Sequence, residues 1–189
     1  MRLPFLFAIS ISLLASSAFA QNDVIKNFRS NSSTAVEFCQ KLSLDELKSL
    51  EEYTSTYSLK QDMNHELIKA SMRYGDKENE RKHRAEGAQL VTEFNKVRED
   101  KRSKLASEGK KCQEEKANEV TSSFKKAISS LKKNTKLSGL LKNYTADVLT
   151  TLEVAITLEN ENSQSYTKRQ AEANNALNRS WNLLQVEAM

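Results

Sequence analysis

The chain lacks most of the residues that build turns. It has 189 residues but only four glycines and one proline, Pro4, near its N-terminus. An all-β fold needs turn residues at intervals of about 8–12 positions, and this chain cannot supply them. It is rich in Lys, Glu, Leu and Ala, which favour helices. The sequence therefore predicts an all-α protein.

Long apolar runs are also scarce. The longest, Leu3–Ala15, follows Arg2 and precedes Ala18-Phe19-Ala20, a small-x-small cleavage pattern. This combination is typical of a secretory signal, and the run is shorter than the roughly 20 residues of a membrane span. We therefore expect residues 1–20 to be a signal peptide, with an uncleaved anchor as the alternative. Residues 21–189 then form a single domain, exported to the bacterial periplasm or otherwise secreted.

Cysteine is limited to Cys39 and Cys112, which lie symmetrically about Tyr74-Gly75-Asp76. If two helices meet at that glycine, residues whose numbers add to about 151 lie side by side. An exported protein with two cysteines favours a disulfide, and the symmetry favours the same pairing. We expect the disulfide Cys39–Cys112. Two separate buried thiols are the alternative.

Apolar residues recur at helical spacing in three segments of similar length, about 23–73, 76–133 and 140–187. Aromatic residues make up only 7% of the chain, as expected for a narrow seam. These segments predict an elongated antiparallel bundle of three long, coiled-coil-like helices. The second turn, 134–139, would place the third segment along most of the second.

Two features allow a fourth helix. Ser30-Asn31-Ser32-Ser33 carries side chains that compete for backbone hydrogen bonds, which predicts a kink or break. Ser43 and Glu46 match the capping box, so a new helix is expected to start there. The sequence leaves open whether 22–42 continues into that helix.

The positive charge is concentrated around the second turn, where residues 120–146 contain lysines but no acidic residue. The lysines of this basic tip are Lys125, Lys126, Lys132, Lys133, Lys136 and Lys142. A basic tip suits an anionic lipid surface, lipopolysaccharide or an acidic protein patch. The alternative is a solvated face. Nucleic acid is not an expected partner, because arginine is absent here and the chain is expected to be exported.

No pattern for catalysis is found. The sequence has no Gly-x-Ser-x-Gly elbow, no glycine-rich phosphate loop and no Cys-x-x-Cys-His motif. His65 and His83 are weak candidates for a metal site, because no second ligand at fixed spacing accompanies either on its helix. We expect no enzymatic activity, no cofactor and no metal.

The polar middle of the third segment is the best candidate for a ligand or partner groove. Its residues are Glu159, Asn162, Tyr166 and Arg169. A polar stripe in a bundle sets the register, lines a cavity or receives another helix. A loosely packed region is the alternative.

Taken together, these patterns predict an exported, non-enzymatic helical interaction protein of the cell envelope. Its expected partner is a protein or unfolded clients, as for a chaperone. A ligand- or lipid-binding bundle of the sensory type is the alternative. The sequence leaves the oligomeric state open.

Overall fold

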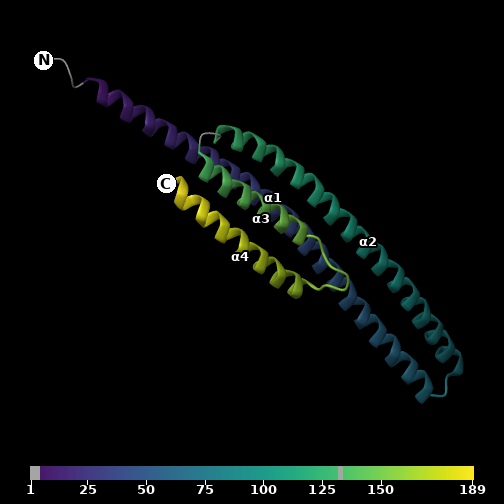
Figure 1. Cartoon of the computed structure of the whole chain (residues 1–189). Coiled ribbons are helices and arrows are strands. Elements are labelled where there is room, and N and C mark those ends of the chain that lie inside the picture. Colours follow the sequence, from purple (N-terminus) through teal and green to yellow (C-terminus); the bar gives the residue numbers. More distant parts are fainter. Residues whose placement is uncertain (1–4, 132–133) are drawn as a thin grey trace.

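The chain folds into an elongated bundle of helices (Figure 1). The computed structural model describes the backbone of residues 5–131 and 134–189, and side chains from Gln21 onward within these ranges. The helices are α1 (Phe5–Arg73), α2 (Lys77–Ser130), α3 (Thr135–Val154) and α4 (Ser163–Ala188). The described residues include no strand, so the all-α prediction is confirmed. The predicted signal, 1–20, lies outside the residues whose side chains are described.

Helices α1 and α2 form the predicted hairpin around Gly75. Gly75 has φ 70°, which glycine adopts without steric cost, and the Asp76 N–H donates to the Ser71 carbonyl at 2.9 Å. Asp76 then caps α2 by accepting a hydrogen bond from the Asn79 N–H at 3.1 Å. The turn therefore both ends one helix and starts the next.

The predicted register of this hairpin is confirmed by the disulfide Cys39–Cys112, whose Cα atoms are 5.8 Å apart. The same register holds far from the cysteines. The rings of Tyr57 and Phe94 stack at 3.8 Å, and their numbers add to 151 as the hairpin requires. The two long helices therefore stay in step over their shared length.

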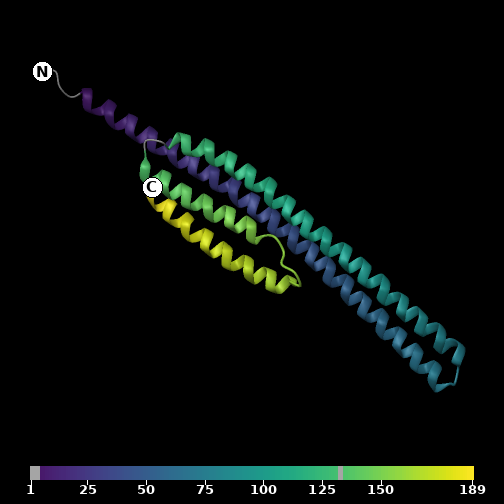
Figure 2. The same cartoon turned by 45° about the vertical axis from the view of Figure 1, so that its right-hand side comes forward.

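Helices α3 and α4 form a second, shorter hairpin that packs along only part of the first (Figure 2). Asn134 caps α3 and Asn162 caps α4, each through its side-chain oxygen. All four helices run together between the α2–α3 turn and the loop that joins α3 to α4. Beyond that loop, α1 and α2 continue alone toward Gly75. We call this projecting part, residues 52–99, the arm.

The hydrophobic core lies where the four helices run together. Phe28 from α1, Tyr144 from α3 and Trp181 from α4 pack edge to face, with ring centroids 5.6–6.1 Å apart. Arg29 lies over the Trp181 ring at 4.3 Å. In the arm, by contrast, no apolar side chain of residues 51–93 is fully buried. The arm therefore has almost no core of its own.

The predicted break at Ser30-Asn31-Ser32-Ser33 is wrong, because α1 continues through it. The Ser32 hydroxyl donates to the Phe28 carbonyl at 2.7 Å, and the Thr34 hydroxyl donates to the Ser30 carbonyl at 2.9 Å. These bonds to the preceding turn satisfy the hydroxyl groups within the helix. The buried neighbours Ala35 and Val36 then hold this stretch in the core.

The predicted helix start at Ser43 is also wrong. Ser43 lies inside α1, fully buried, and its hydroxyl donates to the Ala155 carbonyl at 2.9 Å. The capping pattern with Glu46 is therefore not used, and 22–42 is continuous with the rest of α1.

The third predicted helix is in fact two helices. The expected continuous segment 140–187 breaks between Val154 and Ser163, and the first of its helices begins earlier, at Thr135. The fourth helix therefore arises here and not at Ser30. As a result the third segment does not follow α2 along most of its length, and the arm remains uncovered.

The double variant Cys39→Ser, Cys112→Ser tests the role of the disulfide. The bond joins residues 73 positions apart. In the chain-entropy model, its loss lowers the free energy of unfolding by up to about 4 kcal/mol. Urea denaturation followed by circular dichroism measures this change.

Alkylation tests directly whether the two cysteines are joined in a disulfide. Alkylation without reductant should leave both sulfurs of the native protein unmodified, as mass spectrometry would show. Two alkylated cysteines in protein isolated from its native compartment would contradict the disulfide.

Candidate binding surface

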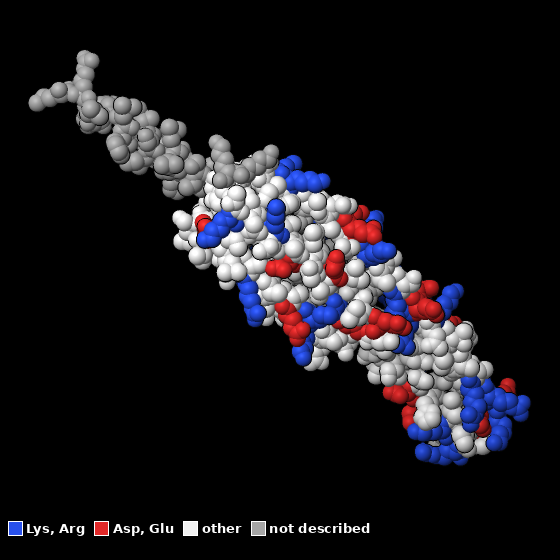
Figure 3. All heavy atoms as spheres, in the orientation of Figure 1, with Lys and Arg blue, Asp and Glu red and all other residues white. Residues whose placement is uncertain are grey.

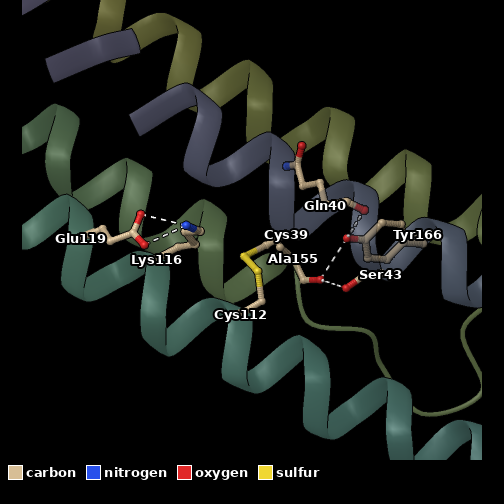
Figure 4. Close-up of a disulfide and its surroundings, with 8 residues drawn as sticks. All are labelled: Cys39, Gln40, Ser43, Cys112, Lys116, Glu119, Ala155 and Tyr166. Atoms are coloured by element: carbon tan, nitrogen blue, oxygen red, sulfur yellow. Dashed lines mark hydrogen bonds and ion pairs between the residues drawn. A yellow bond between two sulfur atoms is a disulfide. The ribbon is translucent and has the colours of Figure 1, made fainter. Parts of the chain in front are cut away.

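A network of polar groups fixes the α3–α4 loop to α1 at the base of the arm (Figure 4). The Ala155 carbonyl accepts hydrogen bonds from Ser43 and from the Tyr166 hydroxyl, both at 2.9 Å. Tyr166 is 1% exposed, and this burial raises the pKa of its phenol to about 12. Its oxygen also lies 3.2 Å from the Gln40 carbonyl. Tyr166 therefore links α4, α3 and α1 at one point.

Arg169 holds the end of α3. Its guanidinium donates to the carbonyls of Val154 and Ile156, which have no partner within the helix. It also makes a two-point ion pair with Glu161, at 2.9 and 2.6 Å, and the Glu161 carboxylate is only 5% exposed. One side chain therefore bonds to the last carbonyl of α3 and to a carbonyl just beyond it, and it pairs with a buried acid of the loop.

The predicted polar groove is thus placed at the α3–α4 loop and the first turns of α4. Tyr166 and Arg169 are engaged in the contacts above, and Asn162 caps α4. Glu159 is exposed in the loop, where it lines a groove of about 700 Å³ together with Arg98 and Arg102 of α2. Ligand or partner binding at these residues stays a prediction.

The seam of the arm mixes apolar and polar residues, and beyond Phe94 none of its apolar side chains is fully buried. At its base, Tyr53 and Tyr57 stack on Phe94. Farther out, Asn64 lies so close to Gly87 that a Cβ atom at this glycine would collide with the amide. Such a seam gives two helices little apolar area to bury, so the arm depends on its base and on contacts within each helix.

Short-range ion pairs support the outer arm. Arg84 pairs with Glu80 at 3.0 Å, and Lys69 with Glu66 at 2.8 Å, both at helical spacing. The hydrogen bond from Lys69 is the main reason that the pKa of Glu66 lies below its ordinary value. Each such pair within one helix stabilises that helix by about 0.2–0.5 kcal/mol.

The arm carries a concentration of exposed apolar side chains. Within the part of the chain whose side chains are described, eleven large apolar residues are exposed, and six of them lie between residues 59 and 91. These six are Leu59, Met63, Leu67, Met72, Tyr74 and Val91. Tyr74 at the turn is 83% exposed and Met63 is 68% exposed. Exposed apolar groups that gather in one region mark interaction surfaces.

A shallow groove runs along one flank of the arm, with a volume of about 400 Å³. One wall comes from α1 and the other from α2. The residues of this arm groove are Lys60, Met63, Asn64, Leu67, Glu86, Gln89, Leu90 and Glu93. The least exposed of these residues are Asn64 and Leu90, and the charged ones are one lysine and two glutamates.

The outer end of the arm is strongly charged, and on the face shown in Figure 3 its Lys and Arg side chains gather near the Gly75 turn. Exposed basic residues there include Arg73, Lys77 and Arg81. Acidic residues such as Glu78 lie among them, so the end is of mixed sign.

The predicted basic tip lies at the opposite end of the bundle. Lys125, Lys126 and Lys142 are exposed there, and Lys136 pairs with Glu187 at 2.6 Å. Lys132 and Lys133 lie outside the described residues. Contact of this tip with an anionic surface stays a prediction.

The two histidines take different positions in the arm. His83 is half-buried and bonded to Glu86 at 2.9 Å, whereas His65 is exposed. In the described part of the chain, no group of three His, Cys, Asp or Glu side chains is placed to hold a metal ion. No described helix combines the length and the apolar character needed to cross a membrane.

The arm surface was missed by the sequence analysis, although a signal for it exists. Residues 76–86 carry no apolar stripe, so this part of α2 has nothing to offer a third helix. Leu59, Met63 and Leu67 recur every four residues on α1, and by the hairpin register Leu67 lies level with this gap. The spacing puts the three side chains on one face of α1, and the lack of an apolar stripe opposite Leu67 is the signal that the outer part of this face has little to pack against.

Comparison with known proteins gives no match. No family model matches the chain, and no curated protein or solved structure is similar to it. The function must therefore be argued from the residues themselves.

Tyr166→Phe tests the network at the base of the arm. In the unfolded chain the phenol ionises near its ordinary pKa of about 10, whereas in the fold the pKa is about 12. The contribution of Tyr166 to stability is therefore full below pH 10 and is lost as the pH rises through about 12. Tyr166→Phe should destabilise the fold by about 1 kcal/mol at neutral pH and make the loss above pH 10 smaller.

Urea denaturation at pH 7, 10 and 11 measures both effects, and the absorbance of phenolate reports the ionisation itself. A variant whose stability falls as steeply with pH as that of the unaltered chain would contradict the assignment.

Proposed function

We propose that the chain is an exported, non-enzymatic binding protein that holds unfolded segments of other proteins on its arm. The observation that carries the proposal is the gathering of six exposed apolar side chains on the arm, on elements that the rest of the fold leaves uncovered. A monomeric soluble protein seldom exposes such a group of side chains unless it contacts a partner.

The distribution of these side chains favours unfolded clients over one folded partner. Met63 and Leu67 lie at the arm groove, Tyr74 lies at the turn, and Met72 contacts Arg84 outside that groove. Clients with different sequences need several apolar contact points and not a single shaped pocket. Methionine suits this use because its unbranched side chain adapts to differently shaped surfaces.

The rigid base suits the same role. The disulfide and the Tyr166 contacts hold the α1–α2 hairpin at the bundle, so the arm projects at full length from a stable platform. A charged outer end keeps this apolar surface in solution between encounters.

Two observations support export. The N-terminal sequence has the pattern of a secretory signal, and the chain contains a disulfide, which is typical of oxidising compartments. The Ala-x-Ala cleavage pattern favours the bacterial periplasm.

The triple variant Met72→Ser, Tyr74→Ser, Val91→Ser tests the proposal. The probe is a reduced and carboxymethylated globular protein, which stays unfolded in native buffer and carries a fluorophore. Removing three apolar contacts should weaken binding at least about tenfold, a loss of about 1.4 kcal/mol. Fluorescence anisotropy measures the dissociation constant.

The matched control is Leu183→Ser, Val186→Ser. These two side chains are as exposed as those of the arm, at 64% and 75%, but lie on α4. The control should bind the probe as the unaltered chain does. Equal binding by the triple variant, or an equal loss in the control, would overturn the proposal, and a single folded partner at fixed ratio after cross-linking would replace it.

A further inference from the structure

We propose that the groove lined by Arg98, Arg102 and Glu159 at the base of the arm, here called the base groove, binds a carboxylate that carries an apolar group. The inference goes beyond the proposed function and concerns a different part of the molecule. Helices α1 and α2 and the α3–α4 loop all contribute to the base groove, whose volume is about 700 Å³. This volume is within the range of sites that hold small ligands.

The fold provides no acidic partner for the two arginines of the base groove. Both are half-buried, and in the described part of the chain neither forms an ion pair. Arg102 donates from Nη1 to the side-chain oxygen of Asn160 at 2.6 Å, while its Nε is buried without a hydrogen-bond partner among the described residues. Burial of a charged group without full compensation costs free energy. An anion in the groove would reduce that cost.

The spacing of the arginines points to the same kind of ligand. Arg98 and Arg102 are four residues apart on α2, so they share one face of the helix with Cβ atoms about 6 Å apart. Like charges at this spacing destabilise a helix. A carboxylate bound by both would offset the repulsion, and guanidinium groups match carboxylates through paired hydrogen bonds. Because Asn160 already holds Arg102, binding immobilises less of this side chain.

The acidic residues of the base groove determine which anion fits. Glu161 is bound by Arg169 at 2.6 Å, and its side chain is only 5% exposed. Glu99 and Glu159 also line the groove and are exposed to solvent. They repel a doubly charged phosphate more strongly than a singly charged carboxylate. The arrangement therefore favours a ligand with one negative charge.

The base groove also offers apolar surface. Its buried lining residues are Leu47, Leu50 and Leu105. Leu158 of the α3–α4 loop lines it too and is 60% exposed. An apolar chain attached to the carboxylate would contact these leucines and remove Leu158 from water, which favours binding. A fatty acid and the C-terminal end of a peptide with an apolar last residue share this chemistry.

Calorimetric titration of the disulfide-bonded protein tests the site and separates the two sources. The probes are octanoate, for a fatty acid, and acetyl-Ala-Ala-Leu with a free carboxylate, for a peptide end. At least one should bind, and the tighter one identifies the source. Octanol and the peptide amide lack the charge and should bind at least about tenfold more weakly than the corresponding acids. Inorganic phosphate should not displace the bound acid.

Variants locate the binding in the base groove. Arg98→Gln and Arg102→Gln each remove one cationic partner and should weaken binding of the acid at least about tenfold. The control Arg179→Gln makes the same change at an exposed position of α4 and should bind as the unaltered chain does. Glu159→Gln removes a nearby like charge and should bind more tightly. Circular dichroism checks that each variant is folded.

Several results would overturn the inference: no binding of either acid, equal binding of the acids and their neutral analogues, or displacement by phosphate. Arginine variants that act no differently from Arg179→Gln, or weaker binding by Glu159→Gln, would overturn it as well. The comparison of acid with neutral analogue needs no variant, so it stays decisive if an arginine variant fails to fold. Binding of the unfolded probe without binding of either acid overturns this inference alone.

Discussion

The register between α1 and α2 is the constraint on which the rest of the structure depends. The disulfide Cys39–Cys112 fixes it at one point, and the turn at Gly75 fixes it at the other end. Between these points Leu47 and Leu105 are buried and Tyr57 stacks on Phe94, but from there outward to the turn no apolar side chain is fully buried, so packing in the outer arm specifies the alignment weakly. Because the register is held covalently, Tyr57 meets Phe94 and Asn64 meets Gly87, and the walls of the arm groove stand opposite each other.

The α3–α4 loop is a second constraint, because there the chain turns back instead of continuing along α2. Arg169 satisfies the end of α3 and Tyr166 ties the loop to α1. These contacts confine the four-helix core to one part of the hairpin. The arm is exposed as a direct consequence, since no further segment is left to cover it. The contacts of Arg169 and Tyr166 therefore determine which part of the α1–α2 hairpin is left uncovered.

The hairpin and its disulfide could be predicted from the sequence because two cysteines and one glycine define a symmetry that needs no tertiary information. The helix breaks could not. Ser32 and Ser43 belong to residue types that compete with helices, but here one hydroxyl bonds within its own helix and the other bonds to Ala155. Only the folded neighbour shows which outcome applies. The break before Ser163 was missed, although Asn162 and Ser165 form a capping box recognisable by its residue types.

Neither helix periodicity nor charge pattern could locate the predicted polar groove within the fold. Its polar residues were predicted for one continuous seam, whereas Arg169 and Tyr166 engage carbonyls that exist only because the helix ends at Val154. The arm surface was overlooked because Leu59, Met63 and Leu67 have helical spacing, which is also the pattern of a buried stripe. Spacing shows that side chains share a face but not whether anything covers it.

Hydrogen exchange of the disulfide-bonded protein, with and without an unfolded client, tests the central claim most directly. The account predicts that the client slows exchange in residues 59–94 and leaves α3 and α4 unchanged. Slower exchange confined to α3 and α4, or no change anywhere at saturating client, would contradict the assignment of binding to the arm.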